Sequence, residues 1–513
     1  MSRIHINGEH LTLAQLYAVA IHSAEVELAM TARARMIASR AVVEKLVASN
    51  TTVYGVNTGF GKMASVRISS EQIQQLQLNL VRSHSCGMGA PLSEHETRAM
   101  LLLRANAIAK GFSGVRPVVA ETLCAMLNHG VHPVIPCQGS VGASGDLAPL
   151  AHLAQVAIGE GEAIYQARKM SGAEAMRQAG IAPLTLEAKE GLALLNGTQG
   201  MLALLGLALD EAENFADAAD VAAALSLDAL RGSPAAFDER IAAVRPYAGH
   251  AVTAEHLARL NRGSAIRESH RSPVKDPRVQ DPYSLRCTPQ VHGAVRDALS
   301  QIRTTIEVEL NSATDNPLVF ADTSSGAAQG AGEIISGGNF HGQPLAMAAD
   351  QMAVALATLA GISERRIEQM TNPQTSQLPA FLIRDAGVNS GFMILQIAAA
   401  SLASEMKAQA APHSVDSIPT SANQEDYVSM GMGAARRLAP MLANLRNILA
   451  IELLCACQGL DLLAPLKTAP EAQKAHDIVR SISKMVDVDR SLARDIEAVG
   501  QAIASAKFSA LLR

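Results

Sequence analysis

The sequence of 513 residues contains no tryptophan, and aromatic residues make up only 3% of it. Its six cysteines are scattered, without the repeated spacing that binds zinc. Lysine and arginine number 43 against 48 aspartates and glutamates, a formal charge of −5, and they form no basic run. We therefore expect no metal and no nucleic-acid partner, and free thiols favour a cytoplasmic setting.

The uncharged stretches of the chain are poor membrane spans. The stretch 122–145 is crowded with histidine, proline and glycine, and the stretch 191–209 is broken by the polar residues that follow Asn196. The first residues have no apolar signal core. We expect no membrane partner.

Apolar residues, mostly alanine and leucine, take up 48% of the sequence, which favours long, closely packed helices. From about Leu186 onward the apolar residues recur with the period of a helix. The pattern predicts long helices over Leu202–Leu227, Gly293–Asn311, Gln343–Thr371, Gly391–Gln409 and Ala434–Leu463. An antiparallel helix bundle with functional loops at its ends fits this pattern.

The first third of the chain is mixed. Short strand-like pieces at Arg3–Ile6 and Thr52–Val56 alternate with helical patterns over Ser70–Arg82 and Glu94–Ile108. The sequence thus predicts a mainly α protein with a long-helix core and a smaller mixed N-terminal domain. We place the N-terminal domain at residues 1–200 and the helical region at 201–513.

Small residues crowd the run 139–146, which contains Ala143, Ser144 and Gly145. Because glycine has no Cβ, the amide nitrogen of Gly145 can attack the carbonyl of Ala143 with little steric penalty. Loss of water from the new ring and from the Ser144 side chain leaves a methylidene-imidazolone, a group that accepts nucleophiles. The spacing by itself fits a tight turn equally well.

Two more clusters of polar residues fall in glycine-rich breaks. The loop around Tyr54 is not a phosphate-binding loop, because Val56 occupies the place of the first glycine and Met63 that of the serine or threonine. Asn196 begins the run Asn-Gly-Thr-Gln-Gly inside an apolar helical pattern. Burying so many polar groups without partners costs roughly 1–3 kcal/mol each, so the run caps a helix or faces a polar cavity.

Two later clusters have structural and functional interpretations. The segment 280–287 brings together Gln280, Tyr283 and Arg286, and the guanidinium suits either a substrate carboxylate or a structural ion pair. The segment 421–426 contains Gln424 and Glu425. Acidic residues here also suit the first turn of a following helix.

Six motifs occur in a characteristic order over nearly the whole chain. They are Tyr-Gly-Val-Asn-Thr-Gly-Phe-Gly (54–61), Gly-Ser-Val-Gly-Ala-Ser-Gly-Asp-Leu-Ala-Pro-Leu-Ala-His (139–152), Leu-Asn-Gly-Thr-Gln (195–199), Gln-Asp-Pro-Tyr-Ser-Leu-Arg-Cys (280–287), Ser-Gly-Gly-Asn-Phe-His (336–341) and Ser-Ala-Asn-Gln-Glu-Asp (421–426). Together they resemble the methylidene-imidazolone ammonia-lyase family. The resemblance implies a helix bundle of the ammonia-lyase and fumarase type.

The sequences Ser83-His84 and Gln424-Glu425 are most similar to the histidine-specific branch of this family. The implied reaction is the non-oxidative deamination of L-histidine to trans-urocanate and ammonia, the first step of histidine degradation. An imidazole both donates and accepts hydrogen bonds, which suits a histidine and a carboxylate. The alternative is a phenylalanine or tyrosine ammonia-lyase or aminomutase of the same family.

The resemblance also assigns roles to residues. The prosthetic group forms from Ala143, Ser144 and Gly145 with help from Asp146, and no external cofactor is implied. Catalytic roles fall to Tyr54, Asn196, Tyr283 and Glu425, and substrate-binding roles to His84, Gln280, Arg286, Phe340 and Gln424. Tyr54 is the implied base. The implied assembly is a homotetramer whose active sites are shared between subunits.

Overall fold

The computed structural model describes residues 3–49, 52–53, 55–59, 63, 66–272, 274–276 and 278–513. Backbone contacts divide the chain into two compact units. Unit 1 consists of Met1–Leu207, Thr304–Asp350 and Pro412–Arg436, and unit 2 consists of Ala208–Arg303, Gln351–Ala411 and Arg437–Arg513. Each unit is drawn from three separate stretches, and a domain boundary near residue 200 stays a prediction.

Unit 1 mixes short strands with helices. Its strands are β1 (Ile4–Ile6), β2 (Val26–Leu28), β3 (Met88–Pro91), β4 (His132–Pro133), β5 (Pro136–Gln138), β6 (Glu162–Tyr165), β7 (Arg168–Ser171), β8 (Leu318–Ala321) and β9 (Gly332–Ile335). Its helices are α1 (Leu13–Ala20), α2 (Met30–Ala48), η2 (Ser70–Gln72), α3 (Ile73–His84), α4 (Glu94–Ala109), α5 (Pro117–His129), α6 (Leu147–Ala157), α7 (Gly172–Gln178), α8 (Glu190–Leu195), η5 (Ser421–Asn423) and α18 (Gly431–Arg436).

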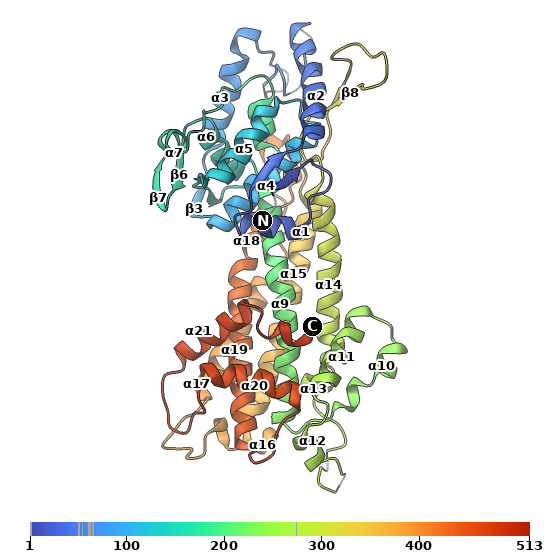
Figure 1. Cartoon of the computed structure of the whole chain (residues 1–513), viewed down its shortest axis with the longest axis vertical. Coiled ribbons are helices and arrows are strands. Elements are labelled where there is room, and N and C mark those ends of the chain that lie inside the picture. The colour runs from blue at the N-terminus through green and yellow to red at the C-terminus, as the bar shows by residue number, and fades with distance from the viewer. Residues whose placement is uncertain are drawn as a thin grey trace. The chain divides into compact units, whose positions relative to one another are not determined.

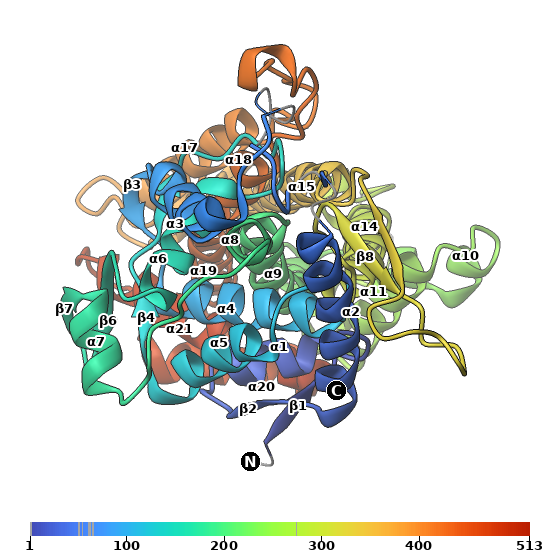
Figure 2. The same ribbon diagram turned by 90° about the horizontal axis from the view of Figure 1, so that it is seen from above.

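The strands form four small sheets. β1 and β2 pair in parallel, β3 pairs with β5, β4, β6 and β7 form a three-stranded sheet, and β8 pairs with β9. Figure 2 shows the β6–β7 hairpin beside α7, which follows it directly in the chain. None of these sheets is large enough to form a core, so the helices of unit 1 provide it.

Helix α4 lies at the centre of this core. The Ser93 side chain accepts a hydrogen bond from the backbone of Glu96, whose side chain accepts one from the backbone of Ser93, so a capping box starts the helix. Every residue from Thr97 to Ala109 is buried, including Arg98 and Arg104. A helix buried on all sides needs partners for its charged residues within the protein.

Unit 2 is helical. It contains η3 (Pro234–Phe237), α10 (Glu239–Ala243), α11 (Ala248–Leu260), α12 (Ala265–Ser269), α13 (Tyr283–Arg286), α16 (Pro373–Ser376), η4 (Ala380–Leu382), α17 (Met393–Gln409), α19 (Leu438–Leu462), α20 (Pro470–Ile482), α21 (Ala493–Ala504) and η6 (Ser509–Leu512). Helix α19 packs against α17 and α21, as Figure 1 shows. Three long helices, α9 (Gln199–Ala229), α14 (Thr288–Leu310) and α15 (Gln343–Thr371), contain residues of both units.

The predicted helices are confirmed with one change. One of the two predicted strands is not confirmed. The last predicted helix is two, because α18 ends at Arg436 and α19 begins at Leu438. Pro440 is the third residue of α19, a place where the missing N–H of proline breaks no helical hydrogen bond. The prediction of a strand at Thr52–Val56 is wrong for the described residues 52, 53, 55 and 56, where the backbone N–H of Val56 instead closes a turn.

The prediction of a mainly α protein with long core helices is confirmed. Two apolar helical segments, Gln343–Thr371 and Gly431–Leu462, have the length and composition of membrane spans. Their most apolar windows are 61% and 67% buried inside the protein, which is typical of core helices.

Candidate active site

A cavity of about 670 Å³ in unit 1 brings together six of the residues that the sequence assigns to the site. Those six are His84, Ser144, Asn196, Phe340, Gln424 and Glu425. The other lining residues are Met63, Leu76, Asn79, Leu80, Ser83, Leu147, Leu192, Leu195, Asn316, Ser336 and Ser421. The residues come from distant parts of the chain, and the cavity is large enough for an amino acid.

The Ala143–Ser144–Gly145 turn lies just before α6 at one wall of the cavity. Gly145 has φ +75° and forms a parallel bridge with Gly197, and a Cβ at position 145 would overlap the Gly197 carbonyl oxygen. Ala143 is buried, whereas the Ser144 side chain faces the cavity. Only glycine permits this backbone contact, so the geometry explains why glycine follows Ser144.

The two residues just before the turn, Val141 and Gly142, are held by the C-terminal part of unit 1. The Ser429 hydroxyl donates to the Gly142 carbonyl at 3.2 Å, and the backbone N–H of Met430 donates to the Val141 carbonyl at 2.8 Å. Gly142 has φ +70°, and a Cβ there would overlap the Ser429 hydroxyl. The turn is thus held in one conformation from both sides.

Asp146 is fully buried beside the turn. Its backbone N–H donates to the Gly197 carbonyl at 2.7 Å, and its carboxyl accepts from the backbone of Met201 at 2.8 Å and from the Ser140 hydroxyl at 3.2 Å. Burial raises the pKa of Asp146 to about 7, against hydrogen bonds that lower it. A carboxyl that titrates near neutral pH can both take up and release a proton.

We expect Asp146 to make stability fall as pH rises from about 4 to about 7. In this window the unfolded chain loses the Asp146 proton while the folded chain keeps it, which costs on the order of 4 kcal/mol in total. Asp146→Asn cannot titrate, so its melting temperature should change less between pH 5 and pH 8 than that of the wild type. Parallel melting-temperature curves for the two proteins would contradict the raised pKa.

Glu425 lies next to Ser144, with 3.4 Å between the Ser144 hydroxyl and a carboxylate oxygen of Glu425. Its other carboxylate oxygen accepts from the Thr420 hydroxyl at 2.6 Å. The expectation of a helix start is wrong, because η5 ends at Asn423 and the next helix begins only at Gly431. Residues 421–423 all have φ between +51° and +62° though none is glycine, a strained turn of the kind found at functional sites.

His84 is the last residue of α3 and lines the same cavity. Its Nδ1 lies 2.9 Å from the Leu80 carbonyl oxygen, which can only accept, so Nδ1 carries the proton and Nε2 is an acceptor in the neutral ring. Burial lowers the pKa of His84, although the Leu80 carbonyl and the charge of Glu425 act in the opposite direction. A neutral histidine thus faces the cavity near a carboxylate.

Asn196 caps the C-terminal end of α8, where the apolar helical pattern breaks before α9. The expectation that this polar run caps a helix or faces a cavity is confirmed. Its side-chain Nδ2 donates to the Asn316 carbonyl at 3.0 Å, and its buried Oδ1 has no partner in the described part of the chain. This oxygen is available to accept a hydrogen bond from a ligand.

Gln280 and Arg286, predicted to bind substrate, and Tyr283, predicted to be catalytic, belong to unit 2. Gln280 and Tyr283 are exposed, Tyr283 by 69%, and the guanidinium of Arg286 lies 4.5 Å from the centre of the Tyr283 ring. Arg286 Nε donates to the Asp281 carbonyl at 3.0 Å. Within the described part of the chain, these contacts leave the Nη1 and Nη2 groups of Arg286 for a carboxylate.

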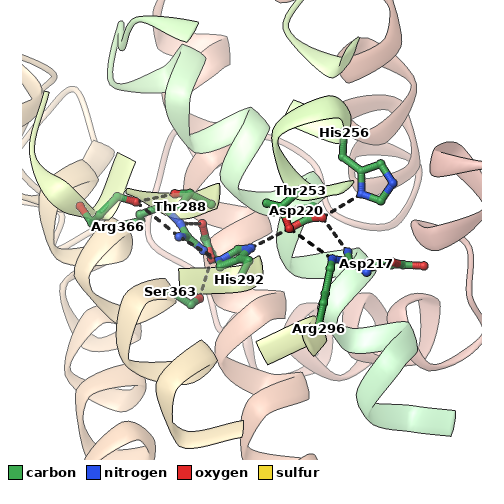
Figure 3. A network of polar contacts seen from close by, with 11 residues as sticks. Asp217, Asp220, Thr253, His256, Thr288, His292, Arg296, Ser363 and Arg366 are labelled. Atoms are coloured by element: carbon green, nitrogen blue, oxygen red, sulfur yellow. Dashed lines mark hydrogen bonds and ion pairs between the residues drawn. The ribbon is translucent and has the colours of Figure 1, made fainter. Parts of the chain in front are cut away.

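The short helix α13, which contains Tyr283 and Arg286, accepts a hydrogen bond from a buried arginine. Arg366 Nη1 donates to the Ser284 carbonyl of α13 at 3.4 Å, and the Arg366 guanidinium forms a two-pronged ion pair with Glu452 at 2.5 and 3.0 Å. Both side chains are fully buried. Figure 3 shows Arg366 between Thr288 and Ser363 in this network.

The network continues from Arg366 to Asp220 of α9. Asp220 accepts from His292 at 2.7 Å, from His256 at 2.8 Å and from Arg296 at 2.6 Å (Figure 3). Burial alone would raise the pKa of Asp220, but the charge of Arg296 and the two histidine hydrogen bonds outweigh it and lower the pKa. None of the buried polar side-chain atoms of Asp220, His292 and Arg366 lacks a hydrogen-bond partner within the described part of the chain, as expected of a satisfied buried polar network.

Tyr54 lies outside the described residues, and its role stays a prediction. Among the residues that the structure describes, no three or more His, Cys, Asp or Glu side chains lie close enough together to hold a metal ion.

Comparison with known proteins decides the family. The sequence pattern of the aromatic amino acid lyase family matches residues 11–481. The histidine ammonia-lyase of Koribacter versatilis (strain Ellin345) is 55% identical over 518 aligned residues that cover all of both chains. The chain belongs to the aromatic amino acid lyase family.

Solved structures of similar proteins agree with this assignment. The crystal structure of histidine ammonia-lyase from Trypanosoma cruzi matches with a TM-score of 0.90 and 42% identity, covering 100% of this chain and 95% of that one. The tyrosine aminomutase of Streptomyces globisporus matches with a TM-score of 0.93 and 38% identity, covering 99% and 98%. The predicted family, helical fold type and carbon–nitrogen lyase class are therefore confirmed.

Sequence reasoning missed several residues of this aromatic amino acid lyase that support the cavity. Asn316 lines it and accepts, through its side chain, from the backbone of Gly337 at 2.7 Å. Its polar surroundings in the loop 314–341 were a signal that could have found it. Arg104 and Gln199 lie behind Asn196, and an arginine inside an apolar helix gives no such signal.

Proposed function

We propose that this chain removes ammonia from L-histidine without oxidation and yields trans-urocanate, the first step of histidine degradation. The observation that carries the proposal is the joint placement of neutral His84 and the Glu425 carboxylate in the cavity that contains Ser144. The full-length relatives named histidine ammonia-lyase, at 50–55% identity, support it. The tyrosine aminomutase, at 38%, is a less similar relative.

The tripeptide fits the prosthetic group that this reaction needs. The Gly145 nitrogen bonds to the Ala143 carbonyl carbon, and that oxygen leaves as water with the amide protons of Gly145 and Ser144. A second water takes the Ser144 hydroxyl and its α-proton, which leaves an exocyclic alkene. The tight Gly145–Gly197 contact and buried Asp146 suit this cyclisation. The finished group would supply an electron-poor carbon that takes up the substrate amino group.

The chain's own residues then bind and orient the substrate. His84 Nε2 accepts a hydrogen bond from the imidazole N–H of the substrate, and Glu425 takes up a proton. The free Oδ1 of Asn196 accepts from the substrate amine. Phe340 and Gln424 line the remaining walls.

Residues of unit 2 complete the site in the proposed assembly. Arg286 binds the substrate carboxylate as a fork, with Gln280 and Tyr283 beside it. Tyr54 is the proposed base that removes the β-proton. From the family resemblance we also propose a homotetramer whose sites are shared between subunits.

Exposed apolar side chains on the long helices support self-association. Val308 of α14, Met347 of α15 and Ile394 of α17 are 65%, 60% and 59% exposed, and other subunits would cover such apolar surface in the proposed assembly. We also propose a cytoplasmic location, since all six cysteines are free thiols.

The substrate is tested with a panel of L-histidine, L-phenylalanine and L-tyrosine, followed by the absorbance of urocanate, cinnamate and coumarate. We expect turnover of histidine, and faster turnover of phenylalanine or tyrosine would replace the proposal with the sister activity. In the same panel His84→Leu should lower kcat/KM for histidine by about 10- to 100-fold, because a substrate N–H is left unpaired. An equal or larger loss with phenylalanine would contradict the place of His84 at the imidazole.

A further inference from the structure

Arg104 is a fully buried arginine behind the cavity, on the helix α4. Its Nη1 donates to the Asn196 carbonyl at 2.8 Å and to the Gln199 side-chain oxygen at 2.7 Å. Its Nε and Nη2 have no partner within the described part of the chain. A charge buried with so few partners costs free energy, so the protein keeps it at the expense of stability.

Burial lowers the pKa of Arg104 to about 10, so the side chain is still a cation at neutral pH. Its hydrogen bond to the Asn196 carbonyl is therefore charge-assisted and stronger than one between neutral groups. Gln199 is fixed in turn, because its Nε2 donates to the Thr314 hydroxyl at 2.7 Å and its oxygen must face Arg104.

The peptide that Arg104 binds also contacts the cyclising turn. Asn196 leads into Gly197, whose carbonyl accepts from Asp146 and whose backbone pairs with Gly145. Gly197 has φ +156°, and a Cβ there would overlap Arg104 Nη1. Gly197 therefore lies close to both Gly145 and Arg104.

We propose that Arg104 is a positioning residue that fixes the Asn196–Gly197 peptide, and through it both the Gly145 turn that cyclises and the Asn196 side chain that binds the substrate amine. The inference rests on the proposed function. Without the guanidinium the peptide can rotate, so the Gly145 nitrogen meets the Ala143 carbonyl carbon less often and the free Oδ1 of Asn196 loses its direction.

A purely structural role is the alternative, and the same helix offers the matched control. Arg98 of α4 is also buried, and it donates to the Val19 carbonyl at 3.0 Å, to the Leu127 carbonyl at 3.2 Å and to His132 Nε2 at 3.1 Å. None of these partners lines the cavity. Arg98→Met should therefore lower stability without affecting cyclisation.

The test uses the full-length protein as Arg104→Met and Arg104→Lys, with Arg98→Met and Arg98→Lys as their matched controls. The mass of the intact chain, sampled over time after synthesis, gives the rate at which two waters are lost. Thermal melting gives stability, and urocanate absorbance gives kcat and KM per matured chain. We expect Arg104→Met to mature about tenfold more slowly and to lose about tenfold in kcat once mature, with Arg104→Lys in between. Arg98→Met should mature at the wild-type rate at a lower melting temperature.

Two results would overturn the proposal: a folded Arg104→Met that matures and turns over at wild-type rates, or an equal maturation delay in Arg98→Met. If Arg104→Met does not fold, Arg104→Lys decides, since it keeps the charge but shortens its reach. Slower maturation of Arg104→Lys, with Arg98→Lys at the wild-type rate, supports the proposal. Maturation of Arg104→Lys at the wild-type rate overturns it. A wild-type chain that never loses two waters would instead refute the proposed function itself.

Discussion

Ser144→Ala is expected to fold and to deaminate histidine at least about a thousandfold more slowly than the wild type. This is the largest effect expected of any substitution proposed in this section. Alanine has no hydroxyl to leave as the second water, so the exocyclic alkene cannot form. The Ser144 side chain is only half-buried and its one described hydrogen bond, to Glu425, is long at 3.4 Å, so stability should change little. Urocanate absorbance measures the rate and intact mass measures the missing second water.

Ser312→Ala is a suitable control for this experiment. Ser312 follows α14 in unit 1, and its hydroxyl donates to the carbonyl of Val308 in the last turn of α14 at 2.8 Å. It should keep wild-type mass loss and activity. Full deamination by Ser144→Ala would remove the prosthetic group from the proposed mechanism.

Glu425→Gln should lower kcat for histidine by about a hundredfold or more while the mass loss of two waters stays complete. The amide keeps the size of the side chain and can still accept from Thr420, but it cannot take up a proton or bear a negative charge beside the substrate ring. The two measurements separate catalysis from maturation. Among the described residues, the one hydrogen bond from the turn to Glu425 is the long one from the Ser144 hydroxyl, at 3.4 Å.

The neighbouring residue provides the matched control. Asp426 is exposed and does not line the cavity, so Asp426→Asn changes the same charge one position along the chain. It should leave kcat within about twofold of wild type. Equal losses in Glu425→Gln and Asp426→Asn would indicate a general charge effect and contradict a catalytic Glu425.

The helices could be predicted because apolar periodicity determines them. The boundaries of α15, Gln343–Thr371, match the sequence prediction, since the apolar stripe and the helix end together. The apolar pattern over Ala434–Leu463 continues across Pro440, so periodicity alone does not show the break between α18 and α19. Proline at the third position of a helix marks a start, and the rule was available from the sequence.

Site residues could be predicted where they belong to contiguous sequence motifs. Residues that hold the site in place from other parts of the chain could not. Ser144, Asn196 and Glu425 were named from motifs, and the structure brings all three to one cavity. The turn at 421–423 could not be predicted, because three residues without glycine rarely adopt positive φ together. The role of Arg104 could not be predicted, because its partners are a backbone carbonyl and a side-chain amide far along the chain. Such partners leave no pattern in the sequence of its own helix.

The anchoring of Val141 and Gly142 by Met430 and Ser429 has a consequence for biosynthesis. On the ribosome the tripeptide emerges long before these anchors are translated. A nascent chain therefore exposes an ordinary, unreactive peptide segment. In the proposed mechanism, the reactive alkene would therefore form only after the anchoring segment has been made and has closed on the turn.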